Sequence, residues 1–101
     1  MDISYWRKRI DMVDAQLVDL LADRSGCVIE IGKLKRQQDL AVRDPQREER
    51  IIAQIIRNNQ GPLENIALVR IFETIIDECV RLEEKVEQGH EPAGGSTPRS
   101  P

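Results

Sequence analysis

Two cations lie on a stripe of the sequence where apolar residues are expected. Residues 20–35, LLADRSGCVIEIGKLK, repeat apolar side chains every three or four positions, which is typical of a buried helix, yet Arg24 and Lys35 fall on that stripe. A helical spacing of about 100° and 1.5 Å per residue places them about 20° and roughly 16 Å apart. Because an unpaired charge is costly to bury, each cation extends to water, meets a structural carboxylate or binds a ligand.

Charged residues also fall on inward positions elsewhere in the chain. Glu83 follows Ile76 and Cys79 at helical spacing, and Arg47 and Glu48 are in line with a later run of isoleucines. A solvated helix start would also explain Arg47 and Glu48, and a frayed helix end would explain Glu83. Together, however, the inward cations predict a pocket for a small anion with more than one carboxylate or phosphate, which arginine binds through two parallel hydrogen bonds.

The remaining reactive residue types indicate no covalent or metal chemistry. The single histidine, His90, lies in a polar tail, and Gly26 and Gly32 fall within a helical pattern rather than a phosphate-binding loop. Cys27 and Cys79 both fall on apolar stripes, which favours reduced, packed thiols over a disulfide or metal site. We therefore expect no metal and no cofactor, and any chemistry should be electrostatic.

The elements that position these residues are predicted to be three helices, giving an all-α fold. The first spans about residues 3–38 and carries two heptad seams: Ile3, Ile10, Leu17, Arg24, Ile31 and Gln38, and Trp6, Val13, Leu20, Cys27, Leu34 and Ala41. Its predicted length of roughly 54 Å exceeds the width of a compact small domain, so one chain cannot cover it. We therefore expect a homodimer.

Turn-forming residues divide the rest of the chain. Asp44 is a good N-cap and Pro45 suits the first helical position, so a second helix should begin there and end at the turn formers of 58–62. A third helix is expected from about Leu63 to Val86, with its inward side formed by Ile66, Val69, Phe72, Ile75, Ile76, Cys79, Val80 and Leu82. The predicted domain spans 1–88, and 89–101, rich in Pro, Gly and Ser, should be a disordered tail.

Composition narrows the class of protein. Aromatic residues make up 3% of the chain and the net charge is −3, which argues against base stacking and against binding to a phosphate backbone. The N-terminal residues lack the apolar stretch of a signal peptide, and no apolar run is long enough to span a bilayer. We expect a cytoplasmic protein with neither a nucleic-acid nor a membrane partner.

Three segments of the chain resemble a known family. RKRIDMVDAQLVDLLADR, IGKLK and VRDPQREE together resemble the all-helical chorismate mutases of the intertwined-dimer class, over about residues 3–86. The resemblance implies a three-helix protomer that exchanges its very long first helix with a partner. It also implies an isomerase that converts chorismate to prephenate by Claisen rearrangement, in the shikimate pathway to Phe and Tyr.

The resemblance also assigns roles to the cations. Arg24 and Arg47 of one chain, with Arg7 entering from the other, would hold the two substrate carboxylates. Lys35 would donate to the ether oxygen, where negative charge develops as the carbon–oxygen bond breaks.

Four further residues take roles by the same resemblance. Asp44, through its backbone, and Glu48 would hold the ring hydroxyl, and Cys79 would line the carboxylate side. Glu83 matches a second donor to the ether oxygen, a role that a glutamate can fill only when it is protonated.

Two other functions remain compatible with the sequence. Isochorismate pyruvate lyase shares the fold and a similar cationic site, although VRDPQREE favours the mutase. A catalytically silent helical dimer, acting as a regulatory or interaction module of a shikimate-pathway enzyme, would explain the heptad seams but not the inward charges. Complex formation with such an enzyme, and feedback control by Phe or Tyr, stay open.

Overall fold

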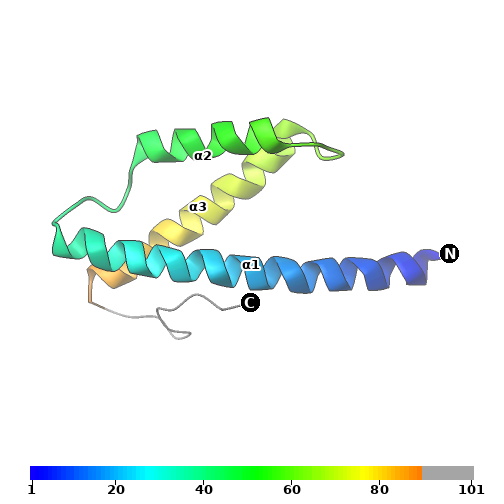
Figure 1. Ribbon diagram of the computed structural model, residues 1–101, viewed down its shortest axis with the longest axis horizontal. Helices are drawn as coiled ribbons and strands as arrows, with labels where there is room; N and C mark the ends of the chain where they lie inside the picture. Colours follow the sequence, from blue (N-terminus) through cyan, green and yellow to red (C-terminus); the bar gives the residue numbers. More distant parts are fainter. Residues whose placement is uncertain (90–101) are drawn as a thin grey trace.

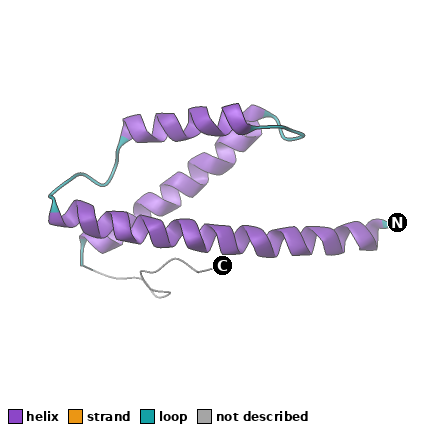
Figure 2. Ribbon diagram, viewed as in Figure 1, coloured by secondary structure: helices purple, strands orange, loops and turns teal. Residues whose placement is uncertain are grey.

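The computed structural model describes residues 1–89, which form three helices. Helix α1 spans Ile3–Gln37, α2 spans Pro45–Asn58 and α3 spans Asn65–Glu87, and no strand occurs within the described range (Figure 2). Helix α1 is a long rod, α2 lies to one side of it, and α3 runs diagonally from the end of α2 back to the C-terminal part of α1 (Figure 1). The predicted all-α, three-helix architecture with a very long first helix is confirmed.

Two aspartates begin the first two helices. The Asp2 carboxylate accepts a hydrogen bond from the Tyr5 backbone N–H at 3.0 Å, and Asp44 accepts one from the Arg47 N–H at 3.1 Å. Pro45 occupies the first turn of α2, where its missing N–H removes no helical hydrogen bond. The predicted start of the second helix is therefore confirmed.

Helix α3 starts two residues later than the predicted Leu63. The Asn59 side chain donates hydrogen bonds to the Leu63 carbonyl and to Asn65 Oδ1, and Glu64 is extended. Gly61 has a φ of +75°, a left-handed conformation that favours glycine. These contacts hold residues 59–64 as a turn, so the helix can begin only at Asn65.

The small core lies where α3 crosses the C-terminal half of α1. Ile29, Ile76 and Val86 are its buried apolar side chains. Gly32 lets the two helices approach closely, because a β-carbon there would lie 3.3 Å from Val86 Cβ and 3.4 Å from Glu83 Cγ. This close approach brings Glu83 against α1.

The N-terminal half of α1 projects beyond the other two helices (Figure 1). Its apolar seam residues are all exposed in the single chain: Ile3, Trp6, Ile10, Val13, Leu17 and Leu20. None of the described helices combines the length and the apolar character that crossing a membrane requires. The tail predicted for 89–101 lies outside the described residues from 90 onward.

Candidate active site

A cavity of about 310 Å³ lies between the three helices and contains most of the predicted site. Its lining includes seven of the eight residues singled out from the sequence, namely Arg24, Lys35, Asp44, Arg47, Glu48, Cys79 and Glu83. Val28, Ile31, Ile51, Ile76 and Val80 supply apolar walls. Arg24 and Lys35 therefore do face one cavity, as their shared stripe predicts.

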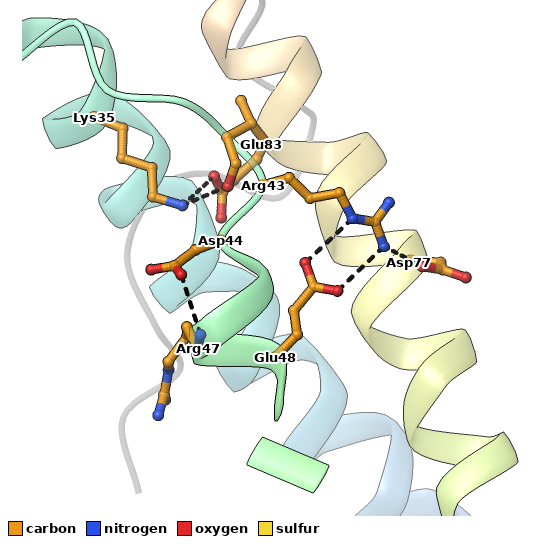
Figure 3. Close-up of polar contacts among 8 residues, drawn as sticks. Lys35, Arg43, Asp44, Arg47, Glu48, Asp77 and Glu83 are labelled. Atoms are coloured by element: carbon orange, nitrogen blue, oxygen red, sulfur yellow. Dashed lines mark hydrogen bonds and ion pairs between the residues drawn. The ribbon is translucent and has the colours of Figure 1, made fainter. Parts of the chain in front are cut away.

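An ion pair forms part of the lining of this cavity. Lys35 Nζ donates to Glu83 Oε2 at 3.0 Å and to the backbone carbonyl of Val42 at 2.7 Å (Figure 3). Glu83 is only 8% exposed, so the prediction that it faces the interior is confirmed and the frayed-end explanation is wrong. The two hydrogen bonds fix the ammonium group on the cavity wall and join α1, the α1–α2 connection and α3.

Two guanidinium groups face the cavity without a carboxylate partner. Arg24 Nη1 donates to the Cys79 sulfur at 3.1 Å, which is a weak acceptor, and Arg24 is half-buried. Arg47 lies in the first turn of α2 and is exposed. Among residues 1–89, neither guanidinium forms an ion pair, so both can bind carboxylates of a bound molecule.

Arg7 is the predicted site residue that the single chain does not bring to the cavity. It lies on the projecting half of α1, roughly 26 Å along the helix axis from Arg24. The Arg7 side chain is exposed and is not part of the cavity lining. A rigid helix cannot bring Arg7 and Arg24 of the same chain to one small ligand.

Arg43 is a charged residue of this region that the sequence analysis missed. Its guanidinium donates from Nε and Nη2 to the two carboxylate oxygens of Glu48, at 3.2 and 3.4 Å, and from Nη2 to Asp77 Oδ1 at 2.6 Å (Figure 3). Hydrogen bonds with Asp77, and then with Glu48, raise the pKa of the Arg43 guanidinium above its ordinary value. The position of Arg43 directly before the N-cap of α2 was the available signal in the sequence.

Two more lining groups differ from the sequence-based interpretation. Cys27, interpreted above as plain packing, is exposed and lines the cavity beside Arg24. The Val42 carbonyl, which accepts from Lys35, is a backbone group whose role no residue type indicates. Both cysteines have free thiols.

The fold and this cavity define a class of protein. A three-helix domain whose long helix carries cations into a small, partly apolar cavity is suited to bind a compact dicarboxylate and to stabilise developing negative charge. Consistent with this class, residues 6–84 match the family described as chorismate mutase type II. The chain belongs to this family of all-helical isomerases of aromatic amino acid biosynthesis.

Individual relatives agree with the family match. The structure of chorismate mutase (form II) from Thermus thermophilus superposes with a TM-score of 0.81 at 34% identity, covering 82% of this chain and 94% of that one. The bifunctional chorismate mutase/prephenate dehydratases of Aquifex aeolicus and Stutzerimonas stutzeri are 35% and 31% identical, over 84% and 77% of this chain. The chain spans about a quarter of the length of these two curated relatives, 25% and 23%.

Proposed function

We propose that this chain catalyses the Claisen rearrangement of chorismate to prephenate, on the route to Phe and Tyr. The observation that carries the proposal is the joint lining of one 310 Å³ cavity by Arg24, Lys35 and Arg47. Chorismate carries two carboxylates, which the two arginines can bind, and an ether oxygen that gains negative charge as its bond breaks, to which the lysine can donate.

The proposed mechanism uses electrostatics and conformer selection. Binding both carboxylates holds the substrate in the compact conformer in which the reacting carbons approach each other. Lys35 donates to the ether oxygen as the bond breaks, and Glu83, when protonated, donates to the same oxygen. Because the apolar walls limit water, these donors act at a low local dielectric and need no reorganisation during the reaction.

The other residues bind the substrate. Arg24 and Arg47 hold carboxylates together with Arg7 of the partner subunit, and Cys79 lines the carboxylate side. The Asp44 backbone and the Glu48 side chain hold the ring hydroxyl. Support comes from the cavity lining, which includes all of these residues except Arg7.

We propose further that the active form is an intertwined homodimer. The support is the exposed apolar seam on the projecting half of α1, where Trp6 is 54% and Leu20 63% exposed. Covering this seam with a second copy removes a large apolar surface from water. The same exchange would bring Arg7 of the partner subunit to the cavity.

Product identification tests the proposed reaction. The purified protein is incubated separately with chorismate and with isochorismate, and the products are identified by chromatography. We expect prephenate from chorismate, without pyruvate. Formation of pyruvate and salicylate from isochorismate would favour the lyase instead, and no turnover of either substrate would favour the catalytically silent dimer.

A further inference from the structure

Glu48 lies on the boundary between two cavities. Besides the 310 Å³ cavity, a wider hollow of about 770 Å³ lies between α2 and α3, and Glu48 and Ile76 line both. The lining of the wider hollow includes three further carboxylates, Glu49, Glu73 and Asp77, and also Arg43. The Glu48 carboxylate could therefore turn toward either cavity unless another residue holds it in place.

Arg43 supplies that contact. Its Nε and Nη2 donate to both oxygens of Glu48, in the fork arrangement that restricts a carboxylate most strongly. Nη2 also donates to Asp77 on α3 at 2.6 Å, so the guanidinium is itself held from a second helix (Figure 3). A carboxylate offers about four acceptor positions, so Glu48 can accept another hydrogen bond while it is paired with Arg43.

Val42, the residue before Arg43, is held by Lys35 of α1. The Val42 carbonyl accepts from Lys35, whose other acceptor is Glu83, whereas Arg43 is bound to Asp77. Asp77 and Glu83 are about 9 Å apart along α3. The start of α2 is thus connected to α3 at two separate points, and loss of the Arg43 contacts leaves the Lys35 contacts in place.

We infer that Arg43 is a positioning residue for the reaction: it holds the Glu48 carboxylate at the edge of the 310 Å³ cavity, where this carboxylate can still accept from the substrate hydroxyl, and is itself fixed by Asp77. This inference rests on the proposed function. The Arg43 and Asp77 side chains are about half exposed, at 51% and 55%, so these ion pairs contribute little to folding stability. The loss of Arg43 should therefore affect substrate binding more than stability.

A double-mutant cycle tests the inference. Arg43→Gln, Glu48→Gln and the double variant are compared with the wild type by steady-state kinetics on chorismate. Because a hydroxyl contact is made equally in the ground and transition states, we expect Arg43→Gln to raise KM about tenfold and to change kcat less than about twofold. In the Glu48→Gln background, Arg43→Gln should raise KM by less than about twofold, because the charge-assisted fork between the two side chains is already lost.

Matched variants separate positioning from a general loss of charge. Arg81→Gln removes the same charge from an exposed ion pair with Glu78 on α3, away from the cavity lining, and should leave KM unchanged. Arg43→Lys keeps the charge without the fork and should raise KM by an intermediate factor. Asp77→Ala removes the second contact of Arg43 and should raise KM about two- to threefold.

Several results would overturn the inference. An Arg43→Gln variant with wild-type KM, or effects of Arg43→Gln and Glu48→Gln that multiply, would show that Arg43 does not act through Glu48. A fall in melting temperature that accounts for the lost activity would assign Arg43 a structural role. If the wild type forms no prephenate, the proposed function fails as well, whereas wild-type turnover with an unaffected Arg43→Gln overturns only the role of Arg43.

Discussion

The two halves of α1 continue one heptad pattern but lie in different surroundings. In the C-terminal half, Ile29 is 4% exposed beneath α3, and Gly32 allows close helix contact. In the N-terminal half, Ile10 and Leu20 are 56% and 63% exposed although they occupy seam positions. A single chain thus buries only the face of the C-terminal half that its own α3 can reach, while the seam residues Ile31 and Leu34 of that half remain 45% and 52% exposed.

The proposed substrate-binding cations are also divided between the two halves of α1. Arg24 and Lys35 come from the covered half of α1 and line the cavity, whereas Arg7 lies on the uncovered half, away from the cavity. We therefore propose that the helix serves two sites, with one half forming the wall of its own cavity and the other available to a second copy.

Replacing Lys35 in the covered half should have the largest effect. Lys35→Ala removes the proposed donor to the ether oxygen, and loss of one preorganised donor typically costs about 3–4 kcal/mol, or on the order of 10²–10³ in rate. The protein should remain dimeric, because Lys35 lies outside the exposed seam. Steady-state kinetics and analytical ultracentrifugation measure the two effects, and near-normal turnover would contradict the role of Lys35.

A charge on the uncovered half should separate the subunits. Val13→Asp places an unpaired carboxylate in the exposed seam, so we expect monomers and an activity loss of about tenfold or more at low protein concentration. Ala15→Asp, on the opposite side of the same helix, is the matched control and should leave the dimer intact. Ultracentrifugation of a Val13→Asp protein that stays dimeric and fully active would oppose the proposed interface.

Glu83, which faces α1 from α3, should determine how activity depends on pH. If Glu83 must be protonated to donate to the ether oxygen, activity should fall as the pH rises. Glu83→Gln donates at every pH, and its profile should be flat within about twofold. A wild-type rate that is already constant from acid to mildly alkaline pH would argue against a protonated Glu83.

The close helix contact in the covered half should give the smallest effect. In Gly32→Ala, overpacking against Val86 costs about 1–3 kcal/mol, and improved helix propensity offsets about 1 kcal/mol of it. We therefore expect the free energy of unfolding to fall by about 1 kcal/mol, measured by urea denaturation at fixed protein concentration. In a Val86→Ala background, which removes the Val86 Cγ1 contact at 3.3 Å but keeps Cβ, the same substitution should destabilise the protein less, and an unchanged loss there would contradict the steric explanation.

Local sequence signals predicted the parts of the molecule that depend on near neighbours. Asp44 and Pro45 mark the start of α2 because capping involves residues within one turn. The positions of Arg24 and Lys35 on one stripe follow from helix geometry alone, and the structure places both at one cavity.

Contacts between distant parts of the chain could not be predicted in this way. Arg43 and Asp77 are 34 residues apart, and only the packing of α2 on α3 brings them together. The Lys35 contact to the Val42 carbonyl depends on the path of a connection, which side-chain types do not specify. The later start of α3 depends on the Asn59 side chain, whose hydrogen bonds compete with helix formation.

Mixing two inactive variants tests the division of the site most directly. Arg7→Ala and Lys35→Ala proteins are unfolded together, refolded as a mixture and assayed for prephenate formation. If each site combines Lys35 of one chain with Arg7 of the other, mixed dimers contain one intact site, and activity should recover to about a quarter of the wild-type value. A mixture that stays as inactive as its two components would contradict a site shared between two chains.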